Sequence, residues 1–276
     1  METREDTLVF ETRDRLFEAP NWTLQNDVLI LNGDGLLWRC DLATGQLSSI
    51  PFEGLPPVNN DHVLDPDGQH IFVSTNDDWQ IYRAPLAGAP VVQITGKEGP
   101  KGLLNFLHGV SPDGKDLAYV GVLTDDTGRF ASAETCVIGT DGKNFRQLTD
   151  GGVPTDGPEY SPDGAWIYFN TEAFSGHAQI ARMRPDGSDA QRLTHSHTVD
   201  WFPHISPDGA KAVYLAYPKG TEGHPADKPV DLMLVEDGNW DEARVAVSLF
   251  GGQGTINVNS WSPDSRKFAY VSYPMM

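Results

Sequence analysis

One short turn sequence recurs along the whole chain and limits its fold more than any other feature. It reads DPDG at 65–68, SPDG at 111–114, 161–164 and 206–209, and SPDS at 262–265, with a weaker copy, TLQND, at 23–27. Neighbouring strong copies lie 45 to 56 residues apart in this chain of 276 residues. Self-similarity at such a period is typical of solenoids and propellers. The sequence therefore predicts a fold made of six copies of one unit.

Each copy continues in the same way after its turn. Ser, Pro, Asp and Gly suit the four positions of a type I turn, because proline presets φ at the second position and glycine tolerates the exit. Alternating apolar runs such as WIYFNT (166–171) and AVYLAY (212–217) follow, and a period of two indicates strands. A second turn, such as TDG at 140–142, precedes a last strand such as FRQLT. Four antiparallel strands repeated six times predict an all-β, six-bladed β-propeller that forms a single domain over residues 1–276.

The last blade has to be completed from elsewhere in the chain. After the SPDS turn the sequence has room for little more than one further strand, which ends at Tyr273–Met276. The one strand-like segment without a place in a repeat is TLVFET, at Thr7–Thr12. We therefore expect this N-terminal strand to supply the outer strand of the last blade and to close the ring.

The charge of the chain limits the kinds of partner that it can bind. Lys and Arg number 20 against 39 Asp and Glu, which gives a formal net charge of −19. Because nucleic-acid affinity comes largely from Lys and Arg, this charge argues against a nucleic-acid partner and against an acidic membrane surface. No run approaches the roughly 18 apolar residues of a membrane span, and the charged N-terminus lacks the apolar core of a signal peptide. We predict a cytoplasmic protein, or a periplasmic one if an export signal has been removed.

The repeat resembles those of the TolB-like propellers, also called WD40-like or PD40 repeats. The resemblance lies in the [SD]PDG turn, the strands after it, the second DG turn and the terminal LT, and it covers nearly the whole chain. It implies the propeller fold but little about function, because a propeller is a scaffold for many activities. The chain has no room for the separate N-terminal domain of TolB itself and contains no G-x-S-x-G motif, so we expect neither TolB nor a serine hydrolase.

The topology of a propeller blade indicates which face carries function. In an antiparallel meander, every second connection lies on the same face. The PDG and DG turns therefore share one face, and the longer, more polar loops share the other. Functional residues tend to lie on variable loops that a rigid scaffold holds. We expect the site on the face opposite the turns, at the starts of the innermost strands.

Three histidines near these strand starts are candidate metal ligands. His62 and His108 lie four residues before the turn prolines of their repeats, whereas His204, like Glu159, lies three before. Imidazole groups that converge from separate strands suit one divalent ion such as Mn, Zn, Fe or Ni. In a regular strand the difference of one residue sends side chains to opposite faces, so a bulge would have to bring them together. A histidine at such a position can equally be a hydrogen-bonded structural residue.

A more distant resemblance, to the oligogalacturonate lyases, suggests an enzyme. Those enzymes are TolB-like propellers that hold a Mn-type ion with several His and a Gln. The resemblance implies a divalent-metal-dependent lyase acting on a carbohydrate, without an organic cofactor. The catalytic candidates are His177, His224, Arg129 and Glu159. The substrate-binding candidates on the same face are Trp22, Asn60, Asn105, Asp200, Trp201, Gln253 and Asn257.

Two non-enzymatic interpretations stay open at this point. One is a protein-interaction propeller whose funnel takes up a peptide or a partner loop, and the negative charge would then favour a basic partner. The other is a sugar-binding or metal-binding propeller that shares the site of the enzyme but performs no turnover. The expected ligand is small, polar and sugar-like, with a protein partner as the alternative.

Overall fold

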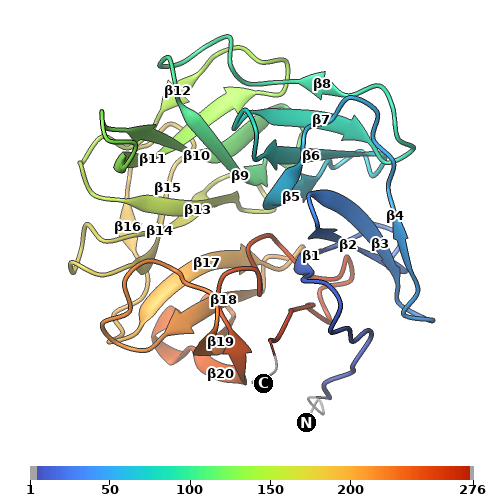
Figure 1. The fold of residues 1–276 in the computed structure, drawn as a ribbon. Helices are drawn as coiled ribbons and strands as arrows, with labels where there is room; N and C mark the ends of the chain where they lie inside the picture. Colours follow the sequence, from blue (N-terminus) through green and yellow to red (C-terminus); the bar gives the residue numbers. More distant parts are fainter. Residues whose placement is uncertain (1–4, 274–276) are drawn as a thin grey trace.

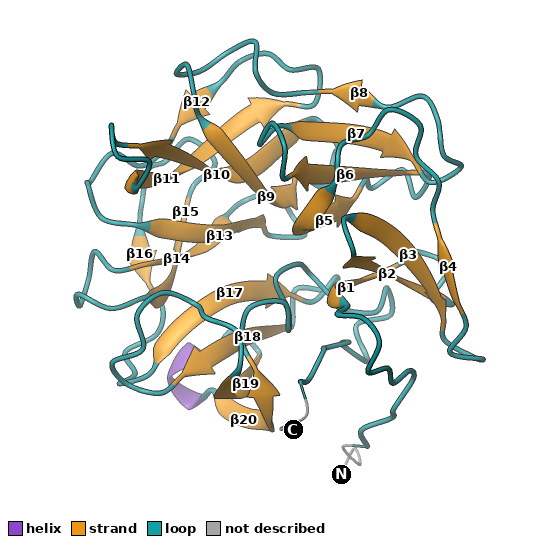
Figure 2. Cartoon of the chain, viewed as in Figure 1, coloured by secondary structure: helices purple, strands orange, loops and turns teal. Residues whose placement is uncertain are grey.

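Five antiparallel sheets of four strands each stand around a central axis and together form a β-propeller (Figure 1). The computed structural model describes residues 5–273. Strands and loops make up nearly all of it, and the one helix among these residues is the 3-10 turn η1 (Trp240–Glu242) (Figure 2). No helix in this range is long and apolar enough to cross a membrane. The predicted all-β propeller class is confirmed.

Within each sheet the strands follow one another in chain order from the axis outwards (Figure 1). The first sheet comprises β1 (Glu18–Trp22), β2 (Val28–Gly33), β3 (Leu36–Asp41) and β4 (Leu47–Ser49). The second comprises β5 (Val58–Leu64), β6 (His70–Thr75), β7 (Ile81–Pro85) and β8 (Val92–Gln93). The third comprises β9 (Leu104–Val110), β10 (Asp116–Thr124), β11 (Phe130–Gly139) and β12 (Arg146–Gln147). The fourth comprises β13 (Thr155–Tyr160), β14 (Ile167–Thr171), β15 (Gln179–Met183) and β16 (Gln191–Arg192). The fifth comprises β17 (Val199–Ile205), β18 (Lys211–Tyr217), β19 (Lys228–Glu236) and β20 (Arg244–Gly251).

The recurrent turns connect the first strand of a sheet to its second. In the third sheet, the Ser111 hydroxyl donates to Asp113 at 2.8 Å and accepts from the backbone N–H of Lys115 at 3.0 Å. Gly114 closes this turn with a left-handed φ of +72°, which glycine adopts at little cost. These turns, and those between the third and fourth strands, lie on one face because the strands are antiparallel. We call it the turn face.

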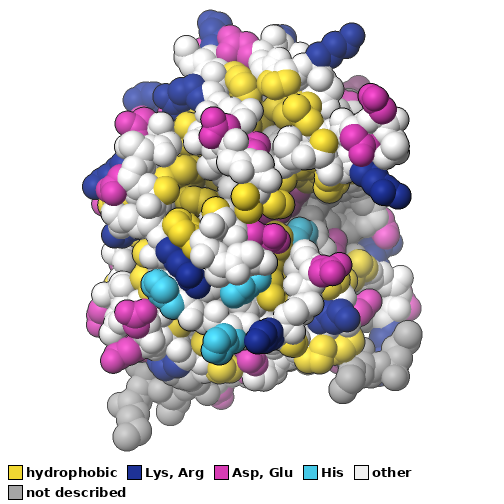
Figure 3. All heavy atoms as spheres, turned by 90° about the vertical axis from the view of Figure 1, so that its left-hand side faces the viewer, with side chains coloured by type: hydrophobic (Ala, Val, Ile, Leu, Met, Phe, Trp, Pro, Cys, Tyr) yellow, Lys and Arg dark blue, Asp and Glu magenta, His cyan; other side chains and the backbone are white. Residues whose placement is uncertain are grey.

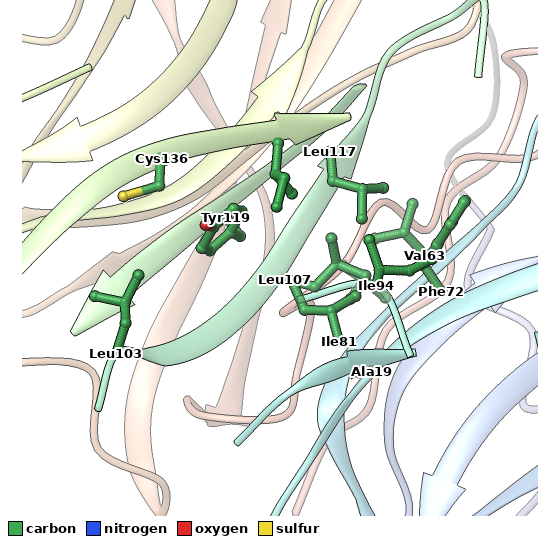
Figure 4. Close-up of a cluster of buried hydrophobic side chains, with 12 residues drawn as sticks. Ala19, Val63, Phe72, Ile81, Ile94, Leu103, Leu107, Leu117, Tyr119 and Cys136 are labelled. Carbon is green, nitrogen blue, oxygen red and sulfur yellow. The ribbon is translucent and has the colours of Figure 1, made fainter. Parts of the chain in front are cut away.

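The hydrophobic core lies between neighbouring sheets. One cluster joins the second and third sheets through the fully buried side chains of Phe72, Ile81, Leu107 and Leu117 (Figure 4). Burying a side chain of this size contributes about 1.5–3 kcal/mol. Because such clusters recur around the ring, the sheets form a rigid frame for the loops at either end.

The prediction of six blades is wrong, because the sixth repeat does not form a sheet. Residues 252–273 lie between the fifth sheet and the first (Figure 1). Among the described residues, their one isolated β-bridge pairs Trp261 with Phe268. The backbone N–H of Tyr273 instead donates to Phe250 of β20. The hydrogen bonds of this segment are thus divided between partners, and no regular ladder develops. We call residues 252–273 the closing segment.

The N-terminal strand that we expected at Thr7–Thr12 does not form either. In the structure this segment has no strand pairing. Val9 and Phe10 pack against the hydrophobic cluster of the first sheet, and Ala269 of the closing segment packs against the same cluster. Apolar side-chain packing, rather than β-pairing, therefore holds the N-terminal segment next to the closing segment.

Every innermost strand contains a register shift, which the alternation of a regular strand does not predict. In β1, β13 and β17, a residue with left-handed φ stands directly before a proline. These residues are Ala19, Gly157 and Phe202, with φ of +52°, +60° and +53°. A bulge re-aims the side chains beyond it. Residues three and four positions before a turn proline are therefore not forced to opposite sides of the sheet.

Candidate functional site

A pocket of 810 Å³ opens on the face opposite the turns. Its walls come from the inner strands β5, β9, β13 and β17, from the start of β11, and from the loop between β18 and β19. The closing segment adds Gln253 and Asn257. The pocket therefore lies where several sheets meet, which is where a rigid frame can hold side chains from distant parts of the chain.

Two acids and two histidines of the lining interact with one another, and we call Asp61, His108, Asp156 and His224 the acid–histidine cluster. His108 Nε2 lies 3.0 Å from one Asp156 oxygen and 4.0 Å from an oxygen of Asp61. His224 Nε2 lies 3.6 Å from the other Asp156 oxygen, and its Nδ1 contacts the side-chain oxygen of Gln253. Asp156 thus holds both histidines.

The cluster shifts the pKa values of its members. Burial alone would lower the pKa of His108, but the hydrogen bond to Asp156 and the charge of Asp61 raise it to about 9. Burial raises the pKa of Asp61 to about 6, although the charge of His108 opposes this. Burial would also raise the pKa of Asp156, but hydrogen bonds from both histidines hold it below its usual range. At neutral pH the pocket therefore contains a protonated His108 beside ionised carboxylates.

Aromatic side chains form the apolar part of the pocket. Trp79 and Phe106 lie 5.4 Å apart by ring centroids, and Phe106 and Phe130 lie 6.4 Å apart. We call these three side chains the aromatic wall. Phe130 is 68% exposed, so the wall reaches the surface. On the side of the molecule that carries β11, β14 and β16, hydrophobic side chains surface close to several histidines (Figure 3).

Two further rings pack against the histidines of the cluster. The Phe202 ring is stacked on His108 at 5.6 Å with an interplanar angle of 25°, and its edge faces His224 at 5.1 Å. Trp201 lies 4.4 Å from His224. The imidazole groups are thus held by hydrogen bonds on one side and by aromatic rings on the other.

Six residues selected from the sequence line this pocket. They are Asn60, His108, Trp201, His224, Gln253 and Asn257. Asn257 also orders the closing segment, because its side-chain oxygen accepts a hydrogen bond of 2.7 Å from the backbone N–H of Gly254. The sequence selection did not include Asp61 and Asp156, although both lie at the same strand starts as His62 and Glu159. Their position beside selected residues was the available signal.

Three of the other selected residues have structural partners. The Asn105 amide donates to the backbone oxygen of Trp79 at 2.9 Å and so fixes the loop of the aromatic wall. Buried Asp200 accepts a hydrogen bond of 2.8 Å from the Ser196 hydroxyl. His177 Nε2 lies 3.3 Å from the backbone oxygen of the same Ser196. These contacts stabilise loops next to the pocket, and the three residues themselves do not line it.

Three more selected residues also lie outside the pocket lining. Arg129 is exposed in the loop between β10 and β11, and Trp22 packs against the hydrophobic cluster of the first sheet. His62 is fully buried, and neither ring nitrogen has a hydrogen-bond partner among the described residues. Burial lowers the pKa of His62 to about 3, so this side chain is neutral.

Glu159 and His204 form a buried pair at the centre of the ring. His204 Nδ1 lies 2.7 Å from one Glu159 oxygen, and the other oxygen accepts hydrogen bonds from the Ile205 N–H and the Asn259 amide at 2.9 and 2.7 Å. His204 Nε2 faces the backbone oxygen of Ile256. The pair therefore joins β13 and β17 to the closing segment and is fully occupied by protein partners.

The structure does not bring together the three predicted metal ligands, His62, His108 and His204. Among the described residues, the one His and acid group with ligand atoms within 4.8 Å of one another is Asp65, Asp67 and His70, on the turn face. Arg83 donates to both carboxylates of that group, at 2.8 and 2.7 Å. Its guanidinium thus offsets one of the two negative charges that would attract a cation.

Comparisons with known proteins identify relatives of this chain. No family model matches the sequence. An uncharacterized protein of Agrobacterium fabrum is 39% identical over 275 residues, which cover 98% of this chain and 89% of that protein. A structure from Agrobacterium tumefaciens, provisionally described as TolB, is 38% identical with a TM-score of 0.88, and the match covers 99% of this chain and 95% of that one.

An oligogalacturonate lyase from Vibrio parahaemolyticus has a similar fold at much lower identity. It is 13% identical with a TM-score of 0.62, and the match covers 91% of this chain and 70% of that one. The structure of an oligogalacturonate lyase in complex with manganese matches equally well, at 15% identity and a TM-score of 0.62. At such identities the similarity shows the fold alone.

Proposed function

This chain belongs to the TolB-like β-propeller family, and we propose that it binds a small, sugar-like ligand in the pocket opposite the turns. The observation that supports this most strongly is the combination of flat aromatic side chains with acids, amides and histidines in one cavity. Pockets of 300–1,000 Å³ that combine apolar walls with a few fixed polar groups are typical of small-molecule sites. The volume of 810 Å³ lies within this range.

The two parts of the pocket match the two surfaces of a sugar ring. A sugar presents a face of C–H groups, which the flat rings of Trp79 or Phe106 can cover. Its hydroxyl groups both donate and accept hydrogen bonds, so they need both kinds of partner. Asp61 can accept them, whereas the amides of Asn60 and Gln253 can do either. The rigid sheets would hold these groups in place before the ligand arrives, which reduces the ordering cost of binding.

The acid–histidine cluster supports a second candidate, elimination from a carbonyl-bearing sugar. Such a reaction needs a base that removes a proton next to the carbonyl and a group that stabilises the negative charge on the carbonyl oxygen. The C–O bond at the β position then breaks as the double bond forms, and the leaving oxygen takes up a proton. Asp61, whose pKa of about 6 is close to neutral pH, has the properties of the base. The protonated His108, 4.0 Å away, could stabilise the charge. Release of an unsaturated product, measured by ultraviolet absorption, would distinguish this enzyme from a binding protein.

The divalent metal expected from the sequence does not fit this pocket well. His108 and His224 both direct Nε2 at Asp156, whereas a metal ligand must present a free lone pair to the ion. We therefore assign no step to a metal in the pocket. The group Asp65, Asp67 and His70 is a candidate for cation binding on the turn face, and metal analysis of the purified protein would test it.

Replacement of an exposed ring tests the proposed binding site. Phe130 lines the pocket but is 68% exposed, so Phe130→Ala should leave the folded structure intact. We expect the dissociation constant of a sugar identified by calorimetric screening to rise about tenfold, which corresponds to about 1.4 kcal/mol of lost contact. The matched control is Phe174→Ala, because Phe174 is also exposed, at 41%, and does not line the pocket. Absence of binding by any neutral, acidic or amino sugar, or equal weakening by both variants, would contradict the proposal.

A further inference from the structure

Asp61 differs from the other members of the acid–histidine cluster because its carboxylate accepts no hydrogen bond from any of the described residues. The residue is only 4% exposed and lines the pocket. Within residues 5–273, its nearest ionic partner is His108 Nε2 at 4.0 Å, beyond hydrogen-bond distance. Its oxygens line the pocket and are not among the fully buried polar atoms without a partner, so they are accessible from the cavity. A ligand in the pocket can therefore supply the donor that the described residues do not.

The charges around Asp61 indicate which kind of donor fits. The described pocket lining contains three acids, Asp61, Asp156 and Glu222, and neither Lys nor Arg. Its two histidines are both directed at Asp156, so the protonated His108 opposes the charge of Asp61 only from 4.0 Å and without a hydrogen bond. Among the described residues, Asp61 is therefore the buried carboxylate of the pocket that no cationic side chain contacts directly. An anionic ligand would meet this charge, and the described lining offers it neither Lys nor Arg.

We propose that the pocket selects ligands that carry a protonated amine, with Asp61 as the anchor of the ammonium group. This inference rests on the proposed function and names the ligand class, which would be amino sugars rather than neutral or acidic ones. A hydroxyl group would give the Asp61 carboxylate a hydrogen bond alone, whereas an ammonium group gives it a hydrogen bond and the attraction of an opposite charge.

The anchor also separates the two candidate functions. A carboxylate that holds an ammonium group is not free to remove a proton from the ligand. Ammonium binding by Asp61 therefore favours a binding protein over an eliminating enzyme. It also distinguishes this pocket from a site for acidic sugars, which would need basic side chains to hold the carboxylates of the ligand.

The proposal predicts a pH dependence for the unmodified protein. The titratable groups that face Asp61 are Glu18 on β1, His108 on β9, Asp156 on β13 and His224 in the loop between β18 and β19. Because the pKa of Asp61 is about 6, its charge appears as the pH rises from about 5 to about 7. Affinity for an ammonium ligand should increase over this range, whereas affinity for a neutral analogue should change little.

A matched series of sugars tests the charge preference by isothermal calorimetry. Glucosamine carries an ammonium group, N-acetylglucosamine has the same ring without the charge, and glucuronate is an anion. At about pH 7 we expect glucosamine to bind at least tenfold more tightly than the other two. Asp61→Asn should abolish this difference. Glu53→Gln, which removes the same charge from an exposed residue outside the pocket lining, should preserve it.

Benzylamine and benzyl alcohol separate failure of this inference from failure of the proposed function. Suppose that no sugar binds, that benzylamine binds more tightly than benzyl alcohol, and that Asp61→Asn removes this difference. The ammonium site at Asp61 would then be supported and the proposed sugar function would be wrong. If neutral or acidic sugars bind as tightly as glucosamine, sugar binding would be supported and the ammonium site at Asp61 would be wrong. Should Asp61→Asn fail to fold, a flat pH profile for ammonium binding by the unmodified protein would equally overturn the anchor.

Discussion

Phe202 combines a buried ring with a backbone conformation that bulky residues rarely adopt. Its φ is +53°, in the left-handed region, where a side chain other than glycine costs roughly 1–2 kcal/mol. This conformation belongs to the bulge of β17, and it places the ring between His108 and His224. The backbone strain is thus located at the candidate site, where strained residues are often found in proteins.

Paired substitutions at Phe202 measure this strain. Phe202→Ala and Phe202→Gly both lose the ring and should cost about 3–5 kcal/mol. In an ordinary strand the glycine variant is less stable than the alanine variant by about 1 kcal/mol. At position 202 we expect the glycine variant to be at least as stable as the alanine variant in urea unfolding. Phe169 on β14 is the control, because it is equally buried and its φ is not left-handed. The same order of stabilities at both positions would show that Phe202 is not strained.

The closing segment replaces a blade and depends on the Glu159–His204 pair for its attachment to the ring. Both side chains are less than 10% exposed, and each is held by more than one partner. A buried charged group that loses its partner is expensive. The pair therefore attaches the closing segment to the regular sheets and does not belong to the candidate site.

Removal of one member of the pair should destabilise the whole propeller. We expect His204→Ala to lower the free energy of unfolding by about 3–5 kcal/mol, because Glu159 loses its imidazole partner. The double variant with Glu159→Gln should lose less than the sum of the two single variants, since the uncompensated charge is gone. His195→Ala, in an exposed loop, should change stability by less than about 0.5 kcal/mol. A stable His204→Ala protein that has lost only its ligand would instead assign His204 to the site.

The molecule as a whole follows its sequence repeat closely in the regular sheets and departs from it where the ring closes. The turn sequence predicts strand order and turn position because proline and glycine act locally, as Gly114 illustrates. The turn sequence predicted one blade too many, because the last repeat bonds to residues outside itself, such as Phe250, instead of forming its own sheet. Alternation likewise could not reveal the bulges of β9 and β17, which change the direction of the side chains near His108 and His204. The face of the pocket was predictable from topology, whereas the roles of Asp61 and Asp156 depend on contacts between blades.

The position of a bound amino sugar tests the central claim most directly. A crystal structure of the protein with glucosamine should show the ligand in the pocket opposite the turns, with its ammonium group within about 3 Å of the Asp61 carboxylate. The sugar ring should lie against the aromatic wall, and His108 and His224 should remain bonded to Asp156. A ligand bound on the turn face or outside the pocket, or an ammonium group directed away from Asp61, would contradict the account.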